Sequence, residues 1–237
     1  MSEWKARRFW KTAQVRPVET GFEIFLDDRP LRTPGKQPLV LPVEGLARAV
    51  AQEWDAQQDV IDPNSMPLTR AANSAIEKVT PQFAAVADML AEYGGTDLLS
   101  YRADQPAELV RRQAEAWDPL VDWAARDLRA PLRITHGVIP IAQDPQVLAC
   151  LRRHLDDLDP LGLTALHDLV TLPGSLILGL AVVRGRIDAT EAFRLSRIDE
   201  DFQIERWGQD EEAQAAAESR RTAMLNAERL WRLSRLS

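Results

Sequence analysis

The spacing of apolar residues changes once along this chain, near Pro42. Before that point, short β-prone runs alternate with the turn-forming stretches DDRP and TPGKQP. These runs are Phe22 to Leu26, Leu31 to Thr33 and Leu39 to Leu41. After Pro42, apolar residues recur every three or four positions, which is typical of amphipathic helices. We therefore expect an α+β fold, in which a small β-rich N-terminal domain (residues 1–45) packs on a larger all-helical domain (residues 46–237).

Two features predict individual helices in the second part. The stretch SLILGLAVV, Ser175 to Val183, is apolar on every side and predicts a buried core helix. It is too short to cross a membrane, which takes about 20 residues. Further on, Asp188 followed by Glu191 forms a variant of the capping box that starts a helix. We expect that helix to continue to Trp207 and to be packed from two sides, because apolar residues line two of its faces.

Composition excludes several classes of protein. The 237 residues are 45% hydrophobic and 27% charged, which is ordinary for a soluble globular protein. A net charge of −7 argues against a general nucleic-acid binder, which needs a basic surface. The single cysteine, Cys150, excludes an internal disulfide and favours a reducing compartment. Because the start, MSEWKARRFWK, resembles neither a signal peptide nor a transit peptide, we expect a cytoplasmic protein that does not insert into membranes.

Sequence signatures of catalysis are missing. Neither G-x-x-x-x-G-K-[ST] nor G-x-G-x-x-G occurs, and His136, His154 and His167 lack the spacing of metal ligands. Ser175 does not meet the G-x-S-x-G pattern of a nucleophile elbow, and core packing explains it better. Neighbouring acids such as Asp156 and Asp157 point apart on a helix. We therefore expect no catalytic residue, no metal and no cofactor.

The most unusual stretch is acidic. Between Asp188 and Glu218, ten acidic residues face three arginines, and after it five arginines face one glutamate. One interpretation is a solvated surface whose acids pair with the chain's own basic tail. The other is an acidic docking surface for a partner that bears arginine or lysine. Trp207 beside Gly208 favours an interface, although a core anchor explains that ring equally well.

Several motifs occur in one order along nearly the whole chain. They are RRFWK (7–11), LDDRPLRTP (26–34), EW (53–54), IDPNSMPLTRAANSAIE (61–77), DLLSYR (97–102), QAEAWDP (113–119), PGSLILGLAV (173–182) and FQIERWGQDEE (202–212). In this combination the chain resembles the assembly chaperones of the F1-ATPase α subunit, of the F1 complex assembly factor 2 type. The resemblance implies a β-rich N-terminal part and a helical C-terminal part, in agreement with the periodicity.

The resemblance also implies a function and a site. Members of this family bind the newly made F1-ATPase α subunit, keep it from aggregating and release it to the β subunit, without catalysis. The mitochondrial members carry a W-G-x-x-E pattern whose acid is linked to function, and Trp207, Gly208 and Glu211 match it. An aromatic residue and a His-Asp pair follow that acid in those members, whereas EAQA (212–215) follows it here. The candidate partner-binding residues are Glu205, Trp207, Asp210, Glu211 and Glu212.

Because a transit peptide is missing, we expect a bacterial, cytoplasmic member of this family, and we expect it to be a monomer. The resemblance implies relatives in the mitochondrial matrix of eukaryotes. Two alternatives are open. The chain could be a general holdase or scaffold without preference for one client. It could also be a hydrolase that uses the acidic cluster near Trp207, which would require a pocket lined by carboxylates of raised pKa.

Overall fold

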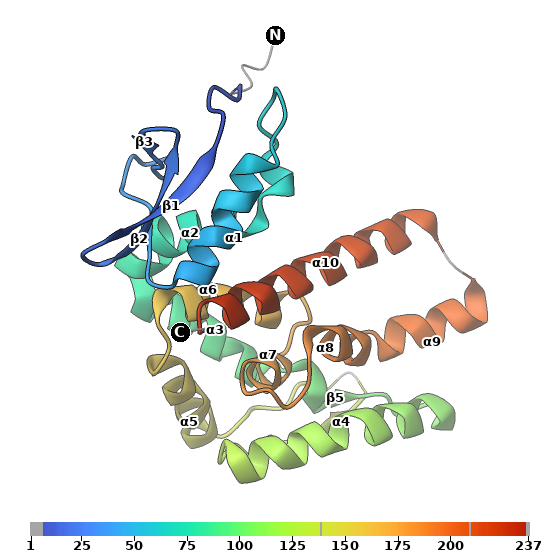
Figure 1. Ribbon diagram of the computed structural model, residues 1–237. Helices are drawn as coiled ribbons and strands as arrows, with labels where there is room; N and C mark the ends of the chain where they lie inside the picture. Colours follow the sequence, from blue (N-terminus) through green and yellow to red (C-terminus); the bar gives the residue numbers. More distant parts are fainter. Residues whose placement is uncertain (1–6, 138, 209, 236–237) are drawn as a thin grey trace. The chain divides into compact units, whose positions relative to one another are not determined.

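The computed structural model describes residues 7–137, 139–208 and 210–235 (Figure 1). The strands are β1 (Ala13–Val18), β2 (Gly21–Leu26), β3 (Arg29–Pro30), β4 (Val40–Leu41), β5 (Tyr101–Arg102) and β6 (Thr135–His136). The helices are α1 (Glu44–Asp55), α2 (Pro67–Ser74), α3 (Phe83–Glu92), α4 (Ala107–Asp127), α5 (Pro145–Asp156), α6 (Pro160–Thr171), α7 (Leu176–Val183), α8 (Ala189–Ser196), α9 (Ile198–Trp207) and α10 (Glu211–Leu233). A small sheet precedes a mostly helical part, so the expected α+β fold class is confirmed. None of the helices in the described ranges has the length and apolar character of a membrane span.

The N-terminal sheet is built around β2. Strands β1, β3 and β4 all pair with it in antiparallel orientation. Along β2, the buried Ile24 and Leu26 alternate with partly exposed residues, as in a strand with one face on the core. The runs expected at 22–26 and 39–41 are confirmed, whereas the run at 31–33 forms only an isolated bridge, between Arg32 and Pro38.

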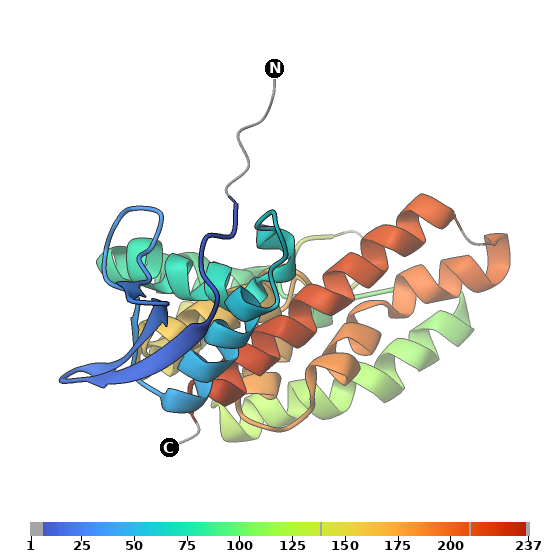
Figure 2. The ribbon, with the colours of Figure 1, turned by 45° about the horizontal axis from the view of Figure 1, so that its top comes forward.

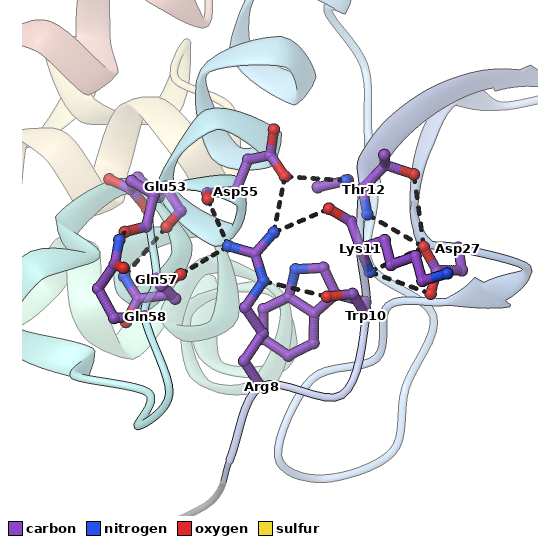
Figure 3. A network of polar contacts seen from close by, with 11 residues as sticks. Arg8, Trp10, Lys11, Thr12, Asp27, Glu53, Asp55, Gln57 and Gln58 are labelled. Atoms are coloured by element: carbon purple, nitrogen blue, oxygen red, sulfur yellow. Dashed lines mark hydrogen bonds and ion pairs between the residues drawn. The ribbon is translucent and has the colours of Figure 1, made fainter.

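Arg8 ties the segment before β1 to the end of α1 (Figure 3). Its guanidinium donates hydrogen bonds to the carbonyl oxygens of Trp10, Lys11, Asp55 and Gln57 at 2.6–3.0 Å. It also bonds the Asp55 carboxylate at 3.3 Å. A planar guanidinium can satisfy several acceptors in different directions at once, which an ammonium group cannot do as well. The RRFWK motif therefore holds the N-terminal strand region on α1.

A buried carboxylate caps α2. Glu53 accepts hydrogen bonds from the backbone N–H groups of Leu68 and Thr69, both at 2.8 Å, and from the Thr69 hydroxyl at 2.7 Å. These N–H groups belong to the first turn of α2, where no helical carbonyl is available to them. The Glu53 carboxylate also lies at the positive end of the helix dipole. The EW motif and the motif at 61–77 are thus joined by one local capping interaction.

A second buried carboxylate, Asp97, joins two distant segments of the helical part. It is fully buried and accepts hydrogen bonds from the Ser175 hydroxyl at 2.7 Å and from the N–H groups of Ile177 and Leu99 at 3.0 Å. Ser175 in turn caps α7, because its Oγ accepts the N–H of Leu178 at 3.0 Å. Burial raises the pKa of Asp97 to about 6. Ser175 is a fully buried structural residue, and the buried helix expected at 175–183 is confirmed.

Trp117 anchors α4 in the same part of the molecule. Its ring is completely buried, and its Nε1 donates a hydrogen bond to the Leu195 carbonyl at 2.8 Å. The Arg102 guanidinium lies 5.1 Å from the ring centroid and forms an ion pair with Asp118 at 2.9 Å. The motifs DLLSYR and QAEAWDP therefore meet in the core.

The helix that begins after Asp188 differs from the prediction in its length. Its start is confirmed, because Asp188 accepts the N–H of Glu191 at 2.7 Å. The prediction of one continuous helix to Trp207 is wrong: the backbone leaves helical geometry at Arg197, and α9 begins at Ile198. Three consecutive acids then occupy the first turn of α9, where the helix dipole favours negative charge. The break thus gives the acids a helix N-terminus that one continuous helix would lack.

By proximity of Cα atoms, the chain divides into two compact units. One comprises Met1–Phe83, Pro160–Thr164 and Arg229–Ser237, and the other comprises Ala84–Asp159 and Ala165–Glu228. The second unit also contains a short parallel pair of strands, β5 and β6, beside its helices. Two-residue strands have too little alternation to be predicted from a sequence. The division does not show which segments fold independently, so the domain boundary after residue 45 stays a prediction.

Candidate functional site: the turn between α9 and α10

The turn between α9 and α10 is shaped by a glycine. Helix α9 ends at Trp207, and the N–H of Gly208 donates to the Ile204 carbonyl at 2.9 Å. Gly208 has φ 90° and ψ 172°, a backbone region that is essentially restricted to glycine. The chain therefore turns sharply after Trp207, and α10 begins four residues later, at Glu211 (Figure 1 and Figure 2). We call Trp207, Gly208, Asp210, Glu211 and Glu212 the tip.

The acids of the tip lie at the start of α10. Asp210 acts as the helix cap, because its Oδ1 accepts the N–H of Ala213 at 2.8 Å. Glu211 and Glu212 occupy the first turn, where the helix dipole favours negative charge. All three side chains are exposed. Among the described residues, the carboxylates of Glu211 and Glu212 have neither a hydrogen-bond donor nor an ion-pair partner.

Trp207 lies on the surface. Its exposed fraction is 78%, the largest of any large apolar side chain in the part of the chain that the structure describes. By contrast, Trp10, Trp117 and Trp123 are buried. The sequence alone was compatible with two roles for Trp207, a core anchor or an interface residue. A rigid ring this exposed is unusual for core packing and typical of a contact residue.

Most acids before the tip have partners within the chain. Glu191 pairs with Arg194 at 2.6 Å, and Arg197 pairs with Glu200 at 2.5 Å and with Asp201 at 3.0 Å. Asp199 accepts a hydrogen bond from the buried Gln113 of α4 at 2.6 Å, and burial raises its pKa. The interpretation as acids paired within the chain therefore applies to the segment before the tip. An acidic docking surface remains a candidate only at the tip.

Glu205 belongs to a charge cluster that links α9 to α4. Arg112 of α4 bonds Glu205 at 2.8 Å and Glu108 at 2.7 Å, and Arg206 of α9 bonds Glu108 at 3.3 Å. The hydrogen bond from Arg112 lowers the pKa of Glu205, and the same guanidinium lowers the pKa of Glu108. We call these four residues the α4 brace.

The structure thus separates the five predicted site residues. It brings Trp207, Asp210, Glu211 and Glu212 together at the tip, whereas the Glu205 carboxylate bonds Arg112 of α4. Sequence reasoning did not find Arg112 or Glu108. They lie more than 90 positions before their partners in α9, and no local pattern indicates so distant a pair.

The hydrolase alternative requires a pocket lined by carboxylates of raised pKa. A groove of about 450 Å³ runs between β1 and α1, and it is lined by Ala13, Gln14, Val15, Glu44, Arg48, Ala51, Gln52 and Asp55. The acids whose pKa is raised, Asp97 and Asp199, are not among these residues. Asp97 is also closed to any substrate. Among the described residues, no group of three or more His, Cys, Asp or Glu is placed to hold a metal ion. This groove therefore does not meet the requirement.

Comparison with known proteins identifies the family. The model of the ATP12 chaperone protein family matches residues 7–125, about half of the chain. Atp12 from Paracoccus denitrificans has the same fold with a TM-score of 0.95 and 71% identity, covering 98% of this chain and all of that one. An aspartate-to-lysine mutant of the Paracoccus protein is similar at 70% identity, 99% and 100% coverage and a TM-score of 0.95.

Two more distant relatives agree with this result. A putative chaperone from Agrobacterium tumefaciens is 40% identical, with a TM-score of 0.90 and coverage of 98% of this chain and 86% of that chain. The mitochondrial protein Atp12 of Schizosaccharomyces pombe is 26% identical over 221 residues, which are 87% of this chain and 75% of the relative. The chain therefore belongs to the ATP12 chaperone family, the assembly chaperones of the F1-ATPase α subunit that its motifs resemble.

Proposed function

We propose that this chaperone captures the unassembled F1-ATPase α subunit at the tip, shields its aggregation-prone surface and yields it to the β subunit. The exposure of Trp207 carries this proposal, since the residue is 78% exposed and lies beside three exposed acids. Large apolar patches on an unassembled subunit promote aggregation until they are covered. A rigid ring surrounded by negative charge suits an apolar patch with arginine or lysine at its edge.

The ring is expected to be the main apolar contact of the tip. A tryptophan buries about 150–250 Å² in an interface, at about 25 cal/mol per Å². For a side chain as exposed as Trp207, complete burial is worth about 3–5 kcal/mol before the entropic cost of association. Acids at an interface rim mainly increase the rate and specificity of encounter.

The protein acts without catalysis, as a monomer in the bacterial cytoplasm, and binds neither nucleic acid nor membrane. The net charge of −7 supports the absence of nucleic-acid binding. The groove between β1 and α1 is lined by neither of the carboxylates whose pKa is raised, which speaks against the hydrolase alternative.

Co-expression tests the proposal directly. The tagged protein and F1 α are produced with and without F1 β, and the complexes are recovered through the tag. We expect soluble α to be recovered with the chaperone when β is absent, and to be lost from it when β is present. Recovery of no α in the absence of β would overturn the proposal.

Two variants locate the contact. Trp207→Ala is expected to weaken α capture about thirtyfold, which corresponds to about 2 kcal/mol for a central contact residue. Phe9→Ala is its control, because Phe9 is another exposed aromatic residue, with an exposed fraction of 61%. Glu211→Lys should slow capture and reduce its salt dependence, whereas Glu19→Lys makes the same charge change at an exposed site in the turn between β1 and β2. Normal capture by both tip variants would place the contact elsewhere.

Client specificity separates this proposal from a general holdase. The purified protein is mixed with F1 α, F1 β and two unrelated aggregating proteins, and light scattering is followed. Selective protection of α is expected, because charge complementarity disfavours unmatched surfaces. Equal protection of all clients would favour the holdase alternative.

A further inference from the structure

Apolar burial alone holds α9 weakly. Of its ten residues, IDEDFQIERW, only Phe202 is buried. A helix of this length is marginal in water, and helices in proteins usually depend on an apolar face for their stability. Since α9 ends in Trp207, whatever holds α9 in place also determines where that ring points.

The α4 brace supplies that support at the C-terminal end of α9. Arg112 lies between two carboxylates, at 2.7 Å from Glu108 on its own helix and at 2.8 Å from Glu205 on α9. Arg206 closes the cluster with its bond to Glu108 at 3.3 Å. The brace therefore alternates negative and positive charges across the two helices, which lie side by side in Figure 1 and Figure 2.

The brace also encloses the one apolar anchor of α9. The guanidinium of Arg112 lies 5.3 Å from the Phe202 ring centroid, and that of Arg206 lies 4.4 Å from it. Cations at these distances are attracted to the ring, and their aliphatic stems cover it. Ion pairs and ring contacts therefore act on the same helical turns, and Glu205 and Arg206 directly precede Trp207.

The geometry points to Arg112 as a positioning residue for client capture: it holds the last turn of α9 against α4 so that Trp207 faces the client. This inference rests on the proposed function of the tip. It also assigns Glu205, predicted as a contact residue, to orienting the tip through Arg112. Partly exposed ion pairs stabilise a fold only weakly, so loss of the brace should affect orientation more than stability.

When fewer molecules hold Trp207 in the binding orientation, the apparent affinity falls in proportion to the fraction that still does. If Arg112→Ala leaves about one molecule in ten with Trp207 correctly placed, apparent affinity for the α subunit falls about tenfold. Glu205→Gln removes the charge on the other side of the brace while keeping side-chain size. We expect it to weaken capture in the same direction.

The neighbouring arginine provides a matched control. Arg111 is also on α4 and forms an ion pair at 2.9 Å, but with Glu115 of the same helix. Arg111→Ala therefore removes the same side chain and charge without touching α9. The assay is the concentration of full-length chaperone that halves light scattering of F1 α diluted from denaturant. A tenfold increase for Arg112→Ala with no change for Arg111→Ala supports the inference.

Two further measurements distinguish a positioning role of Arg112 from a general stabilising role in the fold. Thermal melting should be nearly unchanged in Arg112→Ala, while hydrogen exchange at residues 203–208 accelerates. The double variant Arg112→Glu with Glu205→Arg, which reverses the pair, should recover capture that Arg112→Glu alone loses. Normal capture by Arg112→Ala, or equal losses in both alanine variants, would overturn the inference. If Trp207→Ala captures α normally, the proposed contact at the tip is wrong. If Trp207→Ala is impaired while Arg112→Ala captures normally, only the positioning role of Arg112 is wrong.

Discussion

Protonation of Asp97 should make the stability of this protein depend on pH in an unusual direction. Burial raises the pKa of Asp97 from 3.8 to about 6. The difference is about two pKa units, and each unit corresponds to about 1.4 kcal/mol, which gives about 3 kcal/mol. No discount for solvent screening is needed, because the side chain is fully buried.

The sign follows from proton binding. Between about pH 4 and pH 6, the folded state keeps the Asp97 proton while the unfolded chain has lost it. The stabilisation from this group is therefore complete below about pH 4 and is lost as the pH rises through 6. Acids whose pKa is lowered, such as Glu108 and Glu205, act in the opposite direction. A comparison with a variant cancels their contribution.

The variant is Asp97→Asn, which cannot titrate. In either orientation of the amide, its nitrogen replaces an oxygen that accepts a backbone N–H, from Ile177 in one orientation and from Leu99 in the other. The variant should therefore lose stability at every pH. That loss does not change with pH. The free energy of unfolding is measured by urea titration from pH 4 to pH 7.5 for both proteins. The wild type should lose about 2.5 kcal/mol more than the variant over this range, because the carboxyl of the unfolded chain is already partly ionised at pH 4.

The exposed Asp122 supplies the control. Asp122→Asn makes the same change of charge on the surface of α4 and should leave the pH dependence of the wild type unaltered. Parallel curves for the wild type and Asp97→Asn, with a separation that varies by less than about 0.5 kcal/mol, would refute the reasoning. They would mean that the hydrogen bonds to the carboxylate offset its burial completely.

Three other substitutions test the packing, each by chemical denaturation. Gly179→Ala should destabilise by about 1–3 kcal/mol despite its better helix propensity, because its Cβ would lie 2.5 Å from Val170 Cγ2, whereas Gly45→Ala has open space and should stabilise by about 0.5–1 kcal/mol. Arg8→Ala should cost about 2–3 kcal/mol, since four backbone carbonyls lose a charged donor, and Arg8→Lys should recover less than half. Gly208→Ala meets no neighbouring atom, so its cost of about 1–3 kcal/mol should come from backbone strain alone. If the substitution at Gly179 or Arg8 leaves the free energy of unfolding unchanged, the contacts described there do not stabilise the fold. If Gly208→Ala leaves it unchanged, the backbone at Gly208 is not strained.

Local patterns predicted much of the fold. The change from strand-like to helical spacing near Pro42 predicted the sheet and the helices after it, because both periodicities follow from backbone geometry over a few residues. The apolar run at 175–183 predicted a buried helix, and Asp188 predicted a helix start. Each of these features depends on residues close together in the chain. The break at Arg197 was missed, because the spacing of apolar residues continues through it.

The candidate site, by contrast, depends on contacts between residues that are far apart in the sequence. The sequence determined that the region is acidic, that a Trp-Gly pair interrupts it and that it matches a family motif. Only the tertiary structure decided that Trp207 faces solvent, that Glu205 bonds Arg112 and that Asp97 meets Ser175 across 78 positions. Identical acidic residues can be solvated, paired or buried, and the difference depends on which distant helix packs beside them. Sequence spacing does not record that proximity, since it arises only when the core brings the helices together.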